Sequence, residues 1–168
     1  MKNYFFQKKR TPPLLMILCI LTLISTSLTL LGGVVSLLFG PTKEKQSLTL
    51  AYKLPNDANP DLVDSLEQLD IFLGAINEHF YFYNFASILL ASIGIIAVQK
   101  MLSGKSLGFH LYIIYSIISI AQYYILIPIS EIPSFYIITN LAFSIFYIFL
   151  YSLNLKWMNN QIENENPF

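Results

Sequence analysis

The sequence predicts an all-α membrane protein, an antiparallel bundle of four transmembrane helices with a short amphipathic helix in its outer segment. Of 168 residues, 55% are hydrophobic and only 12% are charged, whereas soluble domains carry about a quarter charged residues. The apolar residues also gather in four runs, each close to the ~20 residues that a helix needs to cross a bilayer. These runs cover about residues 13–39, 80–102, 107–130 and 134–155.

Each apolar run is expected to be a helix, because backbone groups within lipid must be satisfied inside their own segment. The first run begins at Pro12 and Pro13 and ends before Pro41. Proline suits a helix start because the N–H that it lacks has no partner there. The fourth run begins directly after Pro133. We expect a single four-helix membrane domain over residues 1–168.

Basic and aromatic residues predict the orientation of these helices. Four crossings place three basic segments on one side, which should be the cytoplasm. Their residues are Lys2, Lys8, Lys9 and Arg10, then Lys100 and Lys105, then Lys156. We expect a multi-pass protein of the bacterial inner membrane with both termini in the cytoplasm. Aromatic residues that should gather at the outer boundary are Tyr81, Phe82, Tyr83, Tyr123, Tyr124, Phe135 and Tyr136.

Residues 40–79 form the predicted extracytoplasmic segment. Its stretch "SLTLAYKL" alternates like a strand, but a single strand has no partner. Further on, Asn59 is a candidate N-cap and Pro60 suits the first helical position. Apolar residues then recur at helical spacing, at Leu62, Leu66, Leu69, Leu73 and Ile76. We expect an amphipathic helix over about 60–77, which either caps the bundle or binds a partner.

Small and hydrogen-bonding residues recur at steps of three and four within each apolar run. Lipid is as apolar as leucine, so such residues, rather than leucines, mark helix contacts in membranes. We expect four stripes of this kind to form the interior of the bundle. The stripes are Thr22, Ser25, Thr29, Gly32 and Ser36; Asn84, Ser87, Ala91 and Gly94; Tyr112, Tyr115, Ser119 and Gln122; and Asn140, Ser144, Tyr147, Tyr151 and Asn154.

Three amides and one histidine are the candidate site residues. Asn84, Gln122 and Asn140 lie roughly 6–12 Å inside the outer ends of their helices, at ~1.5 Å per residue, and could form one polar cluster. Amide hydrogen bonds that fix helix packing explain such a cluster more simply than a ligand site, because no ionisable group accompanies it. His110, about one turn into the third run, is a candidate pH-sensitive residue. A structural hydrogen bond or contact with headgroups is the commoner role for such a histidine.

Chemistry that enzymes need is missing from the sequence. Charged residues are absent from the middle of every run, and Cys19 is the one cysteine. The stretch Gly104-Lys105-Ser106 is not a phosphate loop, because Gln99 stands where that motif needs its first glycine. We therefore expect no catalytic, cofactor-binding or metal site, no enzyme activity, and no binding of nucleotide or nucleic acid.

Two stretches resemble a set of small bacterial four-helix membrane proteins with no established function. "KKRTPPLLMILCILTLISTSLTLLGGV" is similar to their basic-Pro opening and first helix. "KMLSGKSLGFHLYII" is similar to the turn that leads into their third helix, here with Gly108, Phe109, Leu111 and Tyr112. The resemblance implies the same four-helix inner-membrane architecture, and it implies no catalytic residue.

These observations favour a non-enzymatic accessory or interaction protein that acts by helix packing or through its outer helix. The alternative is a small oligomeric transporter or channel, lined by the Ser, Thr, Tyr and Asn stripes. The expected partners are the lipid bilayer and either another membrane protein or further copies of this chain.

Overall fold

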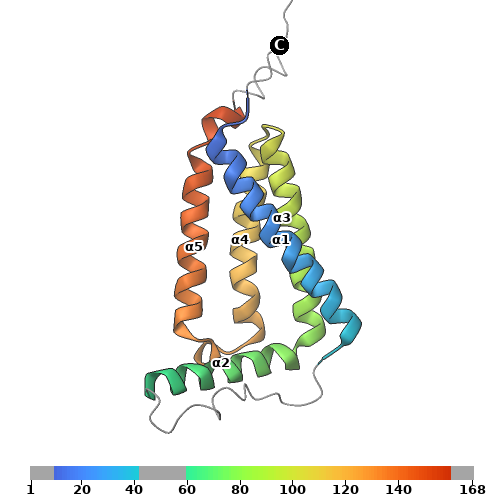
Figure 1. Ribbon diagram of the computed structural model, residues 1–168, viewed down its shortest axis with the longest axis vertical. Helices are drawn as coiled ribbons and strands as arrows, with labels where there is room; N and C mark the ends of the chain where they lie inside the picture. Colours follow the sequence, from blue (N-terminus) through green and yellow to red (C-terminus); the bar gives the residue numbers. More distant parts are fainter. Residues whose placement is uncertain (1–9, 42–59, 160–168) are drawn as a thin grey trace, which may run out of the picture.

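The computed structural model describes residues 10–41 and 60–159, and within them it is all-helical (Figure 1). Four helices are long and apolar enough to cross a membrane: α1 (Pro13–Phe39), α3 (Phe80–Leu102), α4 (Leu107–Leu126) and α5 (Ser134–Ser152). They pack together, while α2 (Pro60–Glu78) lies across one end of the bundle and the 3₁₀ turn η2 (Ile129–Glu131) joins α4 to α5. The predicted all-α class and its four apolar helices are thus confirmed. The strand-like stretch "SLTLAYKL" lies outside the described residues.

Two helices are shorter than their apolar runs. Helix α4 ends at Leu126 because Ile127 is extended, with φ −130° and ψ 132°. Proline disfavours helical geometry in the residue before it, and Pro128 has this effect on Ile127. Helix α5 ends at Ser152, before the predicted limit at Leu155.

Helix α3 is the central element, since it packs along α1 on one side and along α4 on the other. Glycines allow these close approaches, as small residues do in membrane bundles generally. A Cβ on Gly94 would lie 2.7 Å from Cγ2 of Thr26 in α1. Helix α5 packs much less tightly than the other three, and Tyr151 is its one buried residue among the described positions.

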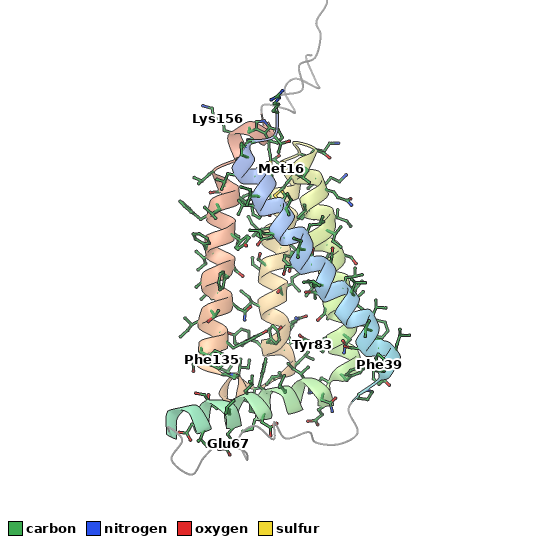
Figure 2. All side chains as sticks on the ribbon, viewed as in Figure 1. Met16, Phe39, Glu67, Tyr83, Phe135 and Lys156 are labelled. Carbon is green, nitrogen blue, oxygen red and sulfur yellow. The ribbon has the colours of Figure 1, made fainter. Side chains whose placement is uncertain are left out.

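An apolar cluster closes the end of the bundle where α1 begins and α5 ends, which we call the terminal end. Figure 2 shows Met16 and Lys156 at the terminal end, and Phe39, Tyr83 and Phe135 at the opposite, or α2, end. The buried members of the cluster come from all four long helices and the segment after α5: Leu15, Leu18, Cys19, Ala97, Val98, Met101, Phe109, Tyr112, Tyr151 and Met158.

Helix α2 is anchored to the α2 end by Phe72. This side chain is buried with Ile127 and Ile132, and its ring centroid lies 5.0 Å from that of Tyr136. Leu66, Leu69 and Ile76 from the predicted apolar face are half-buried, whereas Leu73 is exposed and the side chain of Leu62 lies outside the described ones. Of the described side chains of this face, Leu73 alone is exposed. Phe72 follows Leu69 by three residues, so it shares the same face, and its ring fills the space between two tyrosines.

The turn between α3 and α4 is a helix-ending motif. Gly104 has φ 78°, a left-handed conformation that glycine adopts without steric cost. The N–H of Lys105 donates to the carbonyl of Lys100 at 2.9 Å, and that of Gly104 to the carbonyl of Met101 at 2.9 Å. This pair of bonds is a Schellman motif, which satisfies the last carbonyls of α3. The Gly-Lys-Ser stretch therefore forms a tight helical hairpin.

Candidate functional site

A cleft with a volume of about 330 Å³ lies between α1, α4 and α5. This volume falls within the ~300–1,000 Å³ that is typical of ligand pockets. All but two of the lining residues carry a hydroxyl or an amide. The lining comprises Leu21, Thr22 and Ser25 from α1; Tyr112, Tyr115, Ser116 and Ser119 from α4; and Asn140, Phe143, Ser144 and Tyr147 from α5.

The burial of the lining residues shows how the cleft is oriented. Tyr112 and Ser116 of α4 are buried and form its floor. Leu21 and Ser25 of α1 and Phe143 of α5 are exposed and form its mouth. The cleft therefore opens between α1 and α5, on the apolar outer surface of the bundle.

The helices that border the mouth meet at the terminal end. There the hydroxyls of Thr22 and Tyr151 are 2.8 Å apart and share a buried hydrogen bond. Away from this contact α1 crosses the bundle obliquely, and its Phe39 end lies far from α5 (Figure 1). The divergence of these two helices, together with small serine side chains on α4 and α5, leaves the space open.

The cleft is built from predicted stripes, but these stripes do not close on one another. Steps of three and four residues place Tyr112, Tyr115 and Ser119 on one face of α4, and Asn140, Ser144 and Tyr147 on one face of α5. In the α3 stripe, all four residues are buried.

The prediction was wrong for part of the α1 stripe. Thr29 and Gly32 are exposed, and no atom lies within 4 Å of a Cβ placed on Gly32. Thr26 and Gly33, on the neighbouring face, are buried instead. Thr22 and Gly33 are separated by about three helical turns and therefore lie on the same face of α1. Thr29 and Gly32 lie to one side of this buried face and remain exposed.

Hydrogen bonds do not join the three predicted amides to one another in the described structure. Nδ2 of Asn84 donates to the carbonyl of Phe80 at 2.8 Å, and Nδ2 of Asn140 to that of Tyr136 at 2.9 Å. The amide nitrogen of each asparagine thus donates within its own helix. Gln122 is buried, and its Oε1 has no partner among the described residues. Of the three, Asn140 alone lines the cleft.

Tyrosine hydroxyls supply contacts between helices that the sequence reasoning missed. Tyr136 donates to the hydroxyl of Tyr123 at 2.7 Å, and the hydroxyls of Tyr83 and Tyr123 are 3.3 Å apart. These residues were expected at the outer boundary of the bundle, and within it their hydroxyls join α3, α4 and α5 beneath Phe72. The sequence did contain a signal for this cluster: the three tyrosines lie at one predicted depth on three different helices.

The remaining candidates lie away from the cleft. His110 is exposed in the first turn of α4, with Nδ1 2.9 Å from the carbonyl oxygen of Ser106. Cys19 is buried in the apolar cluster at the terminal end. Within residues 10–41 and 60–159, no three His, Cys, Asp or Glu side chains come together as metal ligands would. Among the described residues that line the cleft, none carries a carboxylate, amine, imidazole or thiol.

Four long apolar helices, three of which border a polar but uncharged cleft, indicate an all-helical membrane protein. Comparison of this chain with protein-family models, with curated proteins and with solved structures finds no match.

Proposed function

We propose that this chain is a multi-pass protein of the bacterial inner membrane, crossed in antiparallel order by α1, α3, α4 and α5, with both termini in the cytoplasm. The charge distribution supports this orientation. Lys100, Lys105 and Lys156 belong to the terminal end, whereas Glu131 and the acidic residues of α2 belong to the other; Lys156 and Glu67 mark the two ends in Figure 2. Lysine and arginine favour the cytoplasmic side of a membrane. Membership of the small bacterial four-helix set remains part of the proposal.

Within the membrane, we propose a non-enzymatic accessory role in which the protein binds a membrane-embedded partner in the cleft between α1, α4 and α5. The cleft is the observation that carries this proposal. The hydroxyls of Ser119, Ser144 and Tyr147 line it without a hydrogen bond to any other described residue. Polar groups that face hydrocarbon without a partner are costly, so a bound molecule that pairs with them would be stabilised.

The same lining supports a role without catalysis. A serine or threonine hydroxyl needs an adjacent base to act as a nucleophile. The cleft offers hydroxyls and one amide, with no imidazole, amine or carboxylate beside them. These groups suit recognition by hydrogen bonding.

Helix α2 is proposed to cap the outer end of the bundle. Phe72 anchors it, while Ile71 and Leu73 remain exposed on either side. An amphipathic helix with apolar residues of this kind can lie along the membrane interface. In this arrangement α2 holds the α2 end closed and the cleft serves as the binding surface.

The alternative function, an oligomeric transporter or channel, draws on the same hydroxyl lining. Packed clusters lie on either side of the cleft along the bundle, however. The Tyr83, Tyr123 and Tyr136 cluster lies toward the α2 end, and the apolar cluster around Tyr151 lies toward the terminal end. Flux of neutral solutes into liposomes that contain the purified protein would favour this alternative.

Photocrosslinking in native membranes tests the binding role. A benzophenone amino acid is placed at Ser144, inside the cleft, and in a matched variant at Thr139, which is exposed on the same helix and does not line the cleft. The proposal predicts a discrete adduct from position 144 that is absent from position 139. Equal labelling at both positions, or none at either, would contradict it.

A further inference from the structure

We infer that the cleft between α1, α4 and α5 binds an uncharged lipid with a small, oxygen-bearing head, such as an isoprenoid quinone or a diacylglycerol. The head enters between α1 and α5, and the apolar chain remains outside. This inference rests on the proposed binding role and names the chemical class of the ligand.

The lining selects for an uncharged head. Hydroxyls both donate and accept hydrogen bonds, so they can pair with carbonyl, ether or hydroxyl oxygens. The cleft presents such groups from three helices, including Ser119 of α4 and Ser144 of α5. A phosphate or ammonium head would find no opposite charge among the lining residues, and an unpaired charge is very costly away from water.

The size of the cleft limits how much of the ligand it can hold. A volume of about 330 Å³ equals roughly ten water molecules at ~30 Å³ each. A single ring or a glycerol backbone fits this volume, but a complete lipid does not. The chain therefore has to leave through the mouth, where Leu21 and Phe143 present exposed apolar side chains.

The tyrosine rings that line the cleft also suit a lipid whose head is a planar ring. The rings of Tyr112 and Tyr115 lie 5.8 Å apart, and both residues line the cleft. Tyr147 lines it from the opposite helix. Aromatic side chains offer broad apolar faces together with a polar tip. A quinone ring could stack on these faces while its carbonyl oxygens accept bonds from hydroxyls.

The depth of the cleft also favours uncharged lipids. Asn140 is six residues from the start of α5, or ~9 Å along the helix. Thr22 is nine residues from the start of α1, or ~14 Å. A head has to leave the headgroup layer to reach these residues, and uncharged heads do so at much lower cost than charged ones.

Binding to the purified full-length protein tests this inference. The protein is placed in nanodiscs of phosphatidylcholine and titrated with a quinone bearing two isoprene units, with dioleoylglycerol, or with phosphatidylglycerol. Retained lipid is measured by native mass spectrometry. Saturable binding of either uncharged lipid supports the inference. If only the quinone or only dioleoylglycerol binds, the result identifies which class of uncharged lipid the cleft accepts.

Two cleft variants and a matched control assign the binding to the cleft. Ser144→Phe fills the space and should weaken binding at least tenfold, while Thr139→Phe should change it less than twofold. Ser119→Ala, which removes a hydroxyl without adding bulk, should weaken binding about threefold and guards against misfolding of the larger variant. Preference for phosphatidylglycerol, failure of both uncharged lipids, or normal binding by Ser144→Phe would overturn the inference.

These experiments distinguish failure of the lipid inference from failure of the proposed binding role. If no uncharged lipid binds while crosslinking at position 144 still gives a discrete protein adduct, the lipid inference fails and the binding role stands. If position 144 also yields no adduct, both fail.

Discussion

Gly108 at the start of α4 lies directly against the backbone of α3, so that a Cβ there would approach the carbonyl oxygen of Ala97 to 2.5 Å. The nitrogen of Met101 would be equally close. Because both are backbone atoms, they cannot move aside as a flexible side chain could. Gly108→Ala should therefore force α3 and α4 apart and destabilise the protein by about 1–3 kcal/mol, the usual cost of overpacking. Thermal unfolding in detergent measures this loss.

Gly32 provides the matched control for that substitution. No atom lies within 4 Å of a Cβ at this helical position. Gly32→Ala should leave stability unchanged or raise it by about 0.5–1 kcal/mol, because alanine loses less backbone entropy in a helix. Similar losses in the two variants would mean that the close α3–α4 packing is not the cause.

The tyrosine cluster at the α2 end should contribute measurably to stability. Tyr123→Phe removes hydrogen bonds to both Tyr83 and Tyr136. Hydrogen bonds between membrane helices average about 0.6 kcal/mol each, so a loss of roughly 1 kcal/mol is expected in denaturant titration. Tyr124→Phe, at an exposed neighbour with no hydrogen bond in the described structure, should have no effect. Equal effects would show that the cluster adds nothing.

Gln122 should be replaceable at a gain in stability. Its Oε1 is buried without a partner in the described part of the chain, and such an orphaned group costs about 1–3 kcal/mol. Gln122→Met keeps a similar length and removes this cost, so the melting temperature should rise. A fall in melting temperature instead would contradict this account of Gln122.

Phe72 should control how firmly α2 is held. Phe72→Ala empties the space beside Ile127, Ile132 and Tyr136. Losing a buried phenylalanine costs about 3–5 kcal/mol. Because Phe72 is the one buried side chain of α2 among the described residues, this loss should weaken the docking of the whole helix. Amide hydrogen exchange across α2 should become fast, while exchange in α3 stays slow. Leu73→Ala, which removes an exposed side chain from the same turn, should leave exchange in α2 unchanged.

The sequence alone predicts the four apolar helices, because the length of an apolar run is read directly from consecutive residues. The bounds of α1 and α3 matched the prediction. The end of α4 was missed because the apolar run continues past Pro128, and apolar character alone does not stop a helix. The role of Phe72 as the anchor of α2 was not predicted. The predicted apolar face was drawn through the leucines, and Phe72 lies on the same face.

The cleft was only partly predictable. Spacing identified which faces of α4 and α5 are polar, and those faces do line the cleft. Spacing could not show that α1 slants away from α5. Because of this slant, the polar faces line an open cleft and do not form a closed interior. Nor could it show that Asn84 and Asn140 bond to their own helices, because the choice between a local and a distant acceptor depends on the packing.

The role proposed for the cleft depends most of all on the helices spanning a bilayer with the terminal end in the cytoplasm. Labelling of single cysteines in intact cells by a membrane-impermeant thiol reagent tests this directly. Ser103, in the α3–α4 turn, and Ser130, in η2, are both exposed, and the buried Cys19 should give little background. We predict that Ser130→Cys is labelled in intact cells and Ser103→Cys only after permeabilisation. Labelling of Ser103→Cys in intact cells would contradict the membrane arrangement and the role built on it.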